Sequence, residues 1–319
     1  MSTVRRFRGW VSGRAFRIVF GVGLLGLLFT WVDLGTMAAE ISALRLDLLM
    51  ALVVAILAAR MIGALRWYLL LRGLHRGVSY AGILRLTFVS DFIGYFTPGS
   101  LGIEALRLYG MARTTSDLAL TATSMLIERM LSFLALIVLV LAALTFLLPG
   151  LPPEIGYLAW LGLAILGIAL FGLMAPTSRQ LTLWLLSHPR LLRVYDAAQK
   201  VHRSLDQYRA RPDVLFASFA ISLVAQLGRC AIVAIGAAAF GVHLSFVLFL
   251  VIVPVIALIT MLPISIAGLG VRELGYVYLF GQVGMPAEVA LSLSLLIRLL
   301  TILLATPGAW FYVRRGVLA

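Results

Sequence analysis

The sequence has few of the charged, histidine and cysteine residues that soluble enzymes use. Only 12% of its 319 residues are charged, four are histidine, and Cys230 is the single cysteine. One cysteine excludes an intramolecular disulfide and a cysteine-based metal site. The HExxH, GxSxG and P-loop lysine signatures are absent, and the histidines stand apart from one another in or near predicted loops. We therefore expect no metal, no cofactor and no nucleotide.

What the sequence has instead is apolar length, because 62% of its residues are hydrophobic. A soluble domain could not cover that much apolar surface, whereas about 20 apolar residues are enough to cross a ~30 Å hydrocarbon core. Two shorter apolar runs, 80–97 and 244–262, lead into Pro/Gly breaks. The sequence predicts an all-α polytopic membrane protein with about six full spans and two re-entrant or broken-helix hairpins. The predicted spans are 16–32, 48–71, 118–148, 156–175, 212–240 and 287–312.

The net charge of +13 would suggest nucleic acid in a soluble protein, but here the basic residues cluster in four segments. They precede the first span, follow the second, fill 176–211 and end the chain. The opposite loops, 33–47, 149–155 and 241–243, contain only Arg45 as a basic residue. By the positive-inside rule we expect the inner (cytoplasmic) membrane of a prokaryote, with both termini cytoplasmic and an uncleaved first span. The expected partner is a membrane lipid, not nucleic acid.

The segment 176–211 interleaves apolar and basic side chains. Seven Lys or Arg residues lie between Arg179 and Arg211, among residues such as Trp184 and Tyr195. This composition is typical of an amphipathic helix that lies on an anionic leaflet, and it is equally compatible with a solvated connector.

The two broken segments resemble each other. The first reads TPGSLGIEALRLYG from Thr97 and the second reads LPISIAGLGVRELGYVYL from Leu262. We expect an inverted-topology repeat within one membrane domain, its halves at 48–148 and 212–315, although ordinary kinks and chance similarity of apolar segments are the alternative. The expected break residues are Pro98, Gly99, Gly102, Pro263, Gly268 and Gly270. Three pairs of charges are 169 positions apart, namely Arg60 and Arg229, Glu104 and Glu273, and Arg129 and Arg298.

Ten charged residues fall within or beside apolar segments, seven arginines and three glutamates. Each costs about 2.5–3.5 kcal/mol at a lipid-facing helix centre, so we expect them to face inward and to pair with other elements. The excess of arginine favours a lipid phosphate as guest, with backbone N–H groups at the glycine breaks as further donors. Arg66 and Arg107 fit structural ion pairs or snorkelling more readily than the others. The predicted binding residues are Arg60, Glu104, Glu128, Arg129, Arg229, Ser265, Arg272, Glu273 and Arg298.

The motifs LPISIAGLGVRELG, PGSLGIEALRLYG and IERML resemble the transmembrane, flippase-like region of lysylphosphatidylglycerol synthases from about Arg60 to Arg315. Ala267 and Ser132 depart from the family pattern, which favours Gly and often Asp there. The resemblance implies translocation of a lipid. Two-part members carry a soluble aminoacyl-transfer domain after this region, and this chain stops at Ala319, so we do not expect it to aminoacylate lipids.

Two functions follow as hypotheses. The first is a flippase-like translocase that moves an anionic or lipid-linked headgroup, a phospholipid or a polyprenyl-linked lipid, through a central Arg/Glu-lined cavity, with a lipid synthase or transferase as a possible partner. The alternative is a membrane-embedded lipid-modifying enzyme, or a regulatory partner of a lipid or glycan transferase. In that case Glu104 and Glu273 could act as acid and base.

Overall fold

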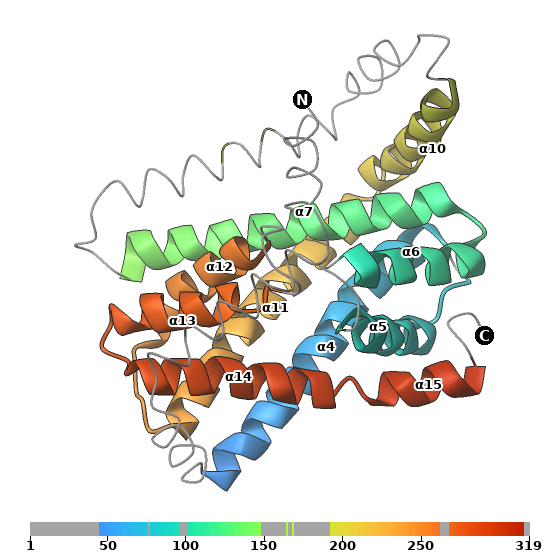
Figure 1. Cartoon of the computed structure of the whole chain (residues 1–319). Helices are drawn as coiled ribbons and strands as arrows, with labels where there is room; N and C mark the ends of the chain where they lie inside the picture. The colour runs from blue at the N-terminus through green and yellow to red at the C-terminus, as the bar shows by residue number, and fades with distance from the viewer. Residues whose placement is uncertain are drawn as a thin grey trace, which may run out of the picture. The chain divides into compact units, whose positions relative to one another are not determined.

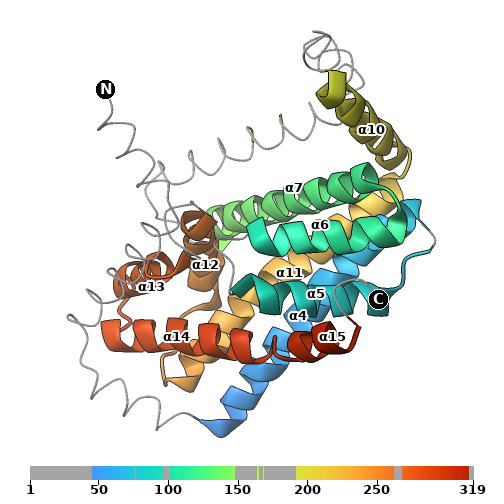
Figure 2. The ribbon, with the colours of Figure 1, turned by 45° about the vertical axis from the view of Figure 1, so that its right-hand side comes forward.

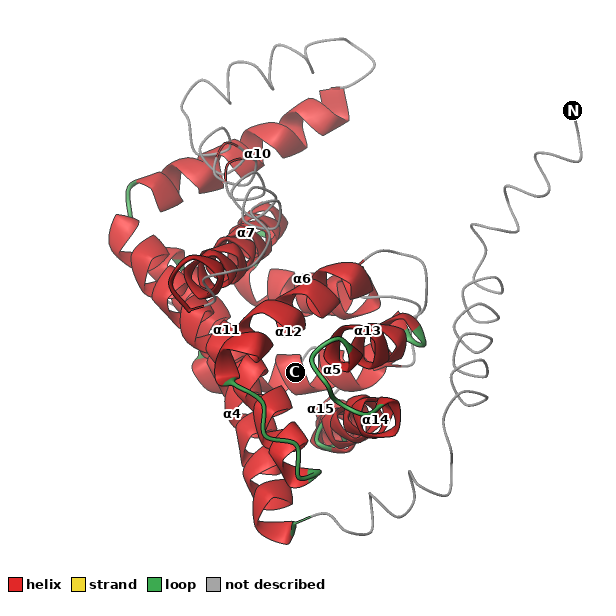
Figure 3. Cartoon of the chain, turned by 90° about the vertical axis from the view of Figure 1, so that its left-hand side faces the viewer, coloured by secondary structure: helices red, strands yellow, loops and turns green. Residues whose placement is uncertain are grey.

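The computed structural model describes residues 45–75, 77–95, 101–147, 164, 168, 192–261 and 268–315. Every regular element in these ranges is a helix (Figure 3). In chain order (Figure 1) they are α4 (Leu46–Leu74), α5 (Tyr80–Tyr95), α6 (Leu101–Thr115), α7 (Leu118–Ala142), a π-helical turn (Ala143–Leu147), α10 (Leu192–Arg209), α11 (Pro212–Ala239), α12 (Phe246–Met261), α13 (Val271–Gly281), α14 (Ala287–Leu303) and α15 (Pro307–Arg315).

In the part of the chain that the structure describes, four helical segments are long and apolar enough to cross a membrane. They are Leu46–Leu74, Leu118–Thr145, Pro212–Ala239 and Ala287–Val313. These confirm four of the six spans expected from the sequence, because each lies where an apolar run of sufficient length was found. The other two expected spans, 16–32 and 156–175, lie outside the described residues apart from the isolated positions 164 and 168.

The two broken segments form pairs of short helices. Helix α5 and helix α12 have 16 residues each, which corresponds to about 24 Å and falls short of the ~30 Å apolar core. Helices α6 and α13 follow them. Three of the six expected break residues, Pro98, Gly99 and Pro263, lie outside the described residues. Gly102 differs from its expected place, because it lies inside α6 and not before it. The inverted repeat and the re-entrant path stay predictions.

The second break is described from Gly268 onward. Gly268 and Gly270 have φ angles of +70° and +79°, in the left-handed region that glycine enters without steric cost. Gly270 is the N-cap of α13. These two glycines therefore let the chain turn directly into the helix that carries Arg272 and Glu273.

The chain divides into two compact units. The first contains Phe88–Glu104 and Arg229–Trp310 together with the start of α4, and the second contains Ala59–Thr87 and Ala105–Gly228. Within the first unit α13 packs along α14 and against α12 (Figure 1). Gly236 of α11 admits the side chain of Leu293, which would lie 2.5 Å from an added Cβ. Small residues allow such close helix approach in membranes, where hydrophobicity does not drive helices together.

In the second unit α6 lies beside α7 (Figure 2). The two helices are joined by a tight turn that the sequence specifies locally. Ser116 has a φ of 55°, and the side chain of Asp117 accepts a hydrogen bond from the backbone N–H of Leu120 at 2.9 Å. Asp at an N-cap satisfies a donor that the first turn of a helix leaves open. Thr115 and Thr121 share a hydrogen bond of 3.0 Å across the turn.

Helix α10, the described part of the connector, packs on protein. Leu205 and Tyr208 are fully buried in an apolar cluster with Leu70, Ile127 and Leu131. The Tyr208 hydroxyl donates to the backbone carbonyl of Leu70 at 3.0 Å, and burial raises its pKa above the usual value. The apolar side of the C-terminal end of α10 therefore packs against α7 and α4. Residues 176–191 lie outside the described part, so the expected leaflet contact of the connector stays a prediction.

Candidate functional site

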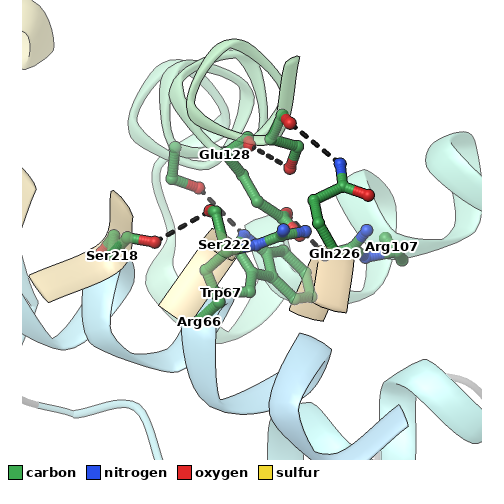
Figure 4. A network of polar contacts seen from close by, with 9 residues as sticks. Arg66, Trp67, Arg107, Glu128, Ser218, Ser222 and Gln226 are labelled. Atoms are coloured by element: carbon green, nitrogen blue, oxygen red, sulfur yellow. Dashed lines mark hydrogen bonds and ion pairs between the residues drawn. The ribbon is translucent and has the colours of Figure 1, made fainter. Parts of the chain in front are cut away.

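A buried charge cluster joins three helices of the second unit (Figure 4). Arg66 of α4 donates from Nη2 to Glu128 Oε1 at 2.6 Å, and Arg107 of α6 donates from Nη2 to Glu128 Oε2 at 2.8 Å. The side chains of Arg66, Arg107 and Glu128 are 11%, 19% and 7% exposed. We call these three residues the Glu128 cluster. It confirms that Glu128, which cannot face its neighbour Arg129 on one helix, pairs with other elements.

The cluster lies well inside the helices that carry it. Arg66 is eight residues before the end of α4, about 12 Å along the axis, and Glu128 is ten residues after the start of α7, about 15 Å. Both helices are candidate membrane spans. At these positions, nearness to a helix end alone does not remove the free-energy cost of a charge in the membrane. Pairing with one another is what stabilises these side chains.

Trp67 also contacts Arg107. The guanidinium carbon of Arg107 lies 4.2 Å from the centroid of the Trp67 ring, a close cation–π contact. The ring is fully buried, and its N–H donates to Ser124 Oγ at 3.1 Å (Figure 4). Two features of one buried side chain thus fix where Arg107 points.

Helix α11 contacts the backbone of α7 next to Glu128. Gln226 donates to the carbonyl of Ser132 at 3.0 Å, and the Ser132 hydroxyl donates to the carbonyl of Glu128 at 2.7 Å (Figure 4). Ser218 and Ser222 of the same helix are fully buried. Gln226 therefore ties α11 to the turn of α7 that presents Glu128.

A second charge cluster lies in the first unit, where α13 meets α14. Glu273 is fully buried, and its Oε1 accepts from Arg298 Nε and Nη2, both at 2.9 Å, and from Ser294 Oγ at 3.4 Å. Its Oε2 accepts from the backbone N–H of Gly270 at 2.7 Å. Arg298 Nη2 also donates to the carbonyl of Gly268 at 3.4 Å. Glu273 thus pairs with another element, as expected for a residue beside Arg272.

This second cluster is neutral and closed. One carboxylate meets one guanidinium, and both carboxylate oxygens have donors. The N–H of Gly270 and the carbonyl of Gly268, which the glycine break frees, are used by the protein's own side chains. We had predicted from the sequence that such N–H groups donate to a bound anion. At Gly270 the N–H instead donates to the carboxylate of Glu273, as the backbone N–H of an N-cap donates to an N3 glutamate in a capping box.

The other predicted residues differ in environment. Arg60 is buried, Glu104 and Arg272 are partly buried, and Arg129 and Arg229 are exposed, and the expectation that these residues face a central site stays a prediction. Arg272 lies over the ring of Tyr276, 5.4 Å from its centroid. Ser265 lies outside the described residues.

Sequence reasoning gave Arg66 and Arg107 the least weight, yet they complete the Glu128 cluster. The cluster also has no counterpart at the aligned positions of the predicted second repeat. At the offset of 169 positions that relates Arg129 to Arg298, the residues Arg66, Arg107 and Glu128 correspond to Ile235, Tyr276 and Ile297. The comparison of aligned positions could have shown that this site belongs to one half only.

Among the described residues no group of three or more His, Cys, Asp or Glu is placed to hold a metal ion. Residues 14–308 match the family model described as the lysylphosphatidylglycerol synthase TM region. The match covers nearly the whole chain and agrees with the resemblance carried by its motifs. No curated protein matches the chain significantly, and neither does any solved structure.

Proposed function

Because the chain belongs to the family of lysylphosphatidylglycerol synthase transmembrane regions, we propose that it carries a lipid with an anionic or lipid-linked headgroup across the membrane. Family membership supports a lipid-related membrane protein. The step to translocation rests on where the charged side chains lie in the helices.

The observation that carries the proposal is a pair of exposed arginines in the middle of candidate spans. Arg129 lies 11 residues after the start of α7, about 16 Å along the helix, and Arg229 lies ten residues before the end of α11, about 15 Å. Both side chains are exposed on the protein surface. A charge in contact with hydrocarbon at such a position costs about 2.5–3.5 kcal/mol. An exposed guanidinium at such a depth can also bind a polar group of the membrane, such as a headgroup phosphate, in addition to its interactions within the protein.

A phosphate suits this surplus of arginine. A guanidinium stays charged at physiological pH and offers parallel N–H groups that match two phosphate oxygens. A lipid phosphate that meets either arginine would have its charge compensated there, which lowers the electrostatic cost of placing a headgroup in an apolar core. Such a route needs no chemistry on the lipid.

The test is lipid movement in proteoliposomes. We expect purified protein to speed the transfer of fluorescent phosphatidylglycerol between leaflets, measured by dithionite quenching, more than that of fluorescent phosphatidylcholine. The lipids should be chemically unchanged in mass spectra taken afterwards. Transfer at the rate of protein-free liposomes, or the appearance of a new lipid species, would contradict the proposal.

A matched pair of variants separates the proposed route from surface charge in general. Arg129→Gln should slow transfer of phosphatidylglycerol. Arg113→Gln should not, because Arg113 lies in the last turn of α6 and already donates to the Tyr109 hydroxyl at 2.8 Å. Equal effects of the two substitutions would point to a general loss of basic charge.

A further inference from the structure

The Glu128 cluster carries more positive charge than its own carboxylate can neutralise. Two guanidinium groups share one carboxylate, so the three side chains have a net charge of +1. Neither Arg66 nor Arg107 forms an ion pair with a second carboxylate in the described ranges. A buried net charge is costly, and proteins compensate it with a counter-ion, a metal or a ligand.

The arginines also keep hydrogen-bonding capacity in reserve. Each of them donates to Glu128 through one nitrogen only. Arg66 Nε, Arg66 Nη1 and Arg107 Nε are buried and have no hydrogen-bond partner among the residues that the structure describes. A buried donor without a partner costs about 1–3 kcal/mol, and more when it belongs to a charged group. Three such donors around one carboxylate are a strong sign that a second acceptor group belongs there.

A phosphate group supplies the acceptor oxygens that these donors lack. A phosphodiester has two charged non-bridging oxygens and one negative charge, so its arrival would bring the charge of the cluster from +1 to zero. It would also give the unused edge of each guanidinium an acceptor.

We infer that Arg66 and Arg107 form an oxyanion subsite for a phosphate group, and that Glu128 is the internal counter-anion that holds both arginines in place when phosphate is absent. The inference rests on the proposed function for its lipid source, but its chemistry is that of phosphate in general. Trp67 acts as a positioning residue, because its ring holds Arg107 at 4.2 Å without contact to the phosphate being required.

In this arrangement Glu128 and phosphate compete for the same two cations. Glu128→Gln keeps the size of the side chain and one acceptor oxygen but removes the competing charge. We expect it to bind phosphate about tenfold more tightly, a change that corresponds to about 1.4 kcal/mol of coupling. It should also release the ligand more slowly, so transport should fall while binding rises. If the ion pairs were purely structural, Glu128→Gln would not bind phosphate more tightly.

The experiment measures binding to the full chain in detergent micelles, by ligand-induced shifts of the unfolding temperature and by native mass spectrometry. The probes are short-chain phosphatidylglycerol, short-chain phosphatidylcholine, glycerol 3-phosphate and inorganic phosphate. Binding of phosphatidylglycerol alone would support the subsite with a lipid source, and binding of glycerol 3-phosphate or inorganic phosphate would support it with a soluble source. Failure of Glu128→Gln to tighten the binding of any probe would overturn the proposal.

Two further variants decide the case if Glu128→Gln does not fold. Arg107→Lys keeps the charge and loses the fork, and we expect it to weaken phosphate binding about tenfold. Trp67→Phe removes the N–H bond to Ser124 and weakens the cation–π contact, and we expect a smaller loss, about threefold. Unchanged binding in both variants would remove the subsite.

The subsite and the proposed function can fail independently. Transport of phosphatidylglycerol that is normal in Glu128→Gln and Arg107→Lys would leave the translocase standing and remove the subsite. Phosphate binding that follows the expected order, in a protein that moves no lipid, would keep the subsite and remove the translocase.

Discussion

Replacing Glu273 by Gln should destabilise the first unit strongly, and the structure sets the size of the effect. The carboxylate is fully buried and uses both oxygens, Oε1 for Arg298 and Oε2 for the Gly270 N–H. An amide has one oxygen and one NH2 group. Whichever way it is turned, its NH2 faces a donor, so at least one of these hydrogen bonds is lost.

The expected cost is about 3–5 kcal/mol. A lost hydrogen bond that leaves a buried donor unpaired costs about 1–3 kcal/mol, and the loss of charge leaves the Arg298 guanidinium, which is only 15% exposed, without its counter-ion. Breaking one side of a buried ion pair in this way typically costs about 3–5 kcal/mol. The upper part of the range applies if Arg298 cannot reorient toward a polar surface.

A double-mutant cycle separates the pair from the rest. Glu273→Gln, Arg298→Met and the double variant would be unfolded in mixed micelles by titration with a denaturing detergent, with helix content followed by circular dichroism. We expect the double variant to be about 2 kcal/mol more stable than the sum of the single effects predicts, because removing both partners leaves no orphaned charge. Arg298→Lys, which keeps the charge, should be destabilised less than Arg298→Met.

Additivity within about 0.5 kcal/mol would refute the reasoning, because it would mean that the two residues do not act on each other. The control is Arg272→Gln on the same helix. Arg272 contacts the Tyr276 ring, and the loss of a cation–π contact of this kind costs about 1 kcal/mol. A control as severe as Glu273→Gln would show only that α13 tolerates no change.

Three further predictions follow from packing and topology. Gly308→Ala should destabilise the protein by about 1–3 kcal/mol, because the new Cβ would lie 2.1 Å from the backbone oxygen of Phe88, whereas Gly63→Ala, with nothing within 4 Å, should be neutral or stabilising in thermal unfolding. Tyr208→Phe removes the hydroxyl that donates to the carbonyl of α4, so it should cost about 1 kcal/mol and speed proteolysis at the end of α10. Single cysteines in 149–155, in a background free of native cysteine, should react with an impermeant reagent in intact cells; labelling only after permeabilisation would overturn the topology.

The spans were predictable because apolar length is a local property. The residues that begin and end the helices also carried local signals, as at Pro212, a proline at the first helical position with an acidic residue after it. The break at Gly268 and Gly270 could be expected from glycine in an apolar segment, since both adopt positive φ angles. The pairing of Glu273 with Gly270 had a signal as well, because a Glu three residues after an N-cap often returns to its N–H.

The partners of Glu128 were not predictable in the same way. Which side chains meet depends on how α4, α6 and α7 cross, and a single sequence does not contain crossing angles. From the sequence alone Arg66 fitted a structural ion pair or a snorkelling side chain, so local reasoning gave it a lesser role. The contact of Arg107 with Trp67 likewise joins residues 40 positions apart and leaves no local trace.

In the inverted repeat that the sequence predicts, the uneven distribution of charge between the halves would have an energetic consequence. In a chain of two equal inverted halves, exchanging the conformations of the halves returns an equivalent molecule, so the inward-open and outward-open states are equal in free energy. Here Arg66, Arg107 and Glu128 stand in one half, where the other has two isoleucines and a tyrosine at the aligned positions. If such halves exchanged their conformations, the buried charges of one half would change their surroundings, and the other half has no equivalent charges. The resting populations of the two states would then be unequal, and a bound anion would redistribute them.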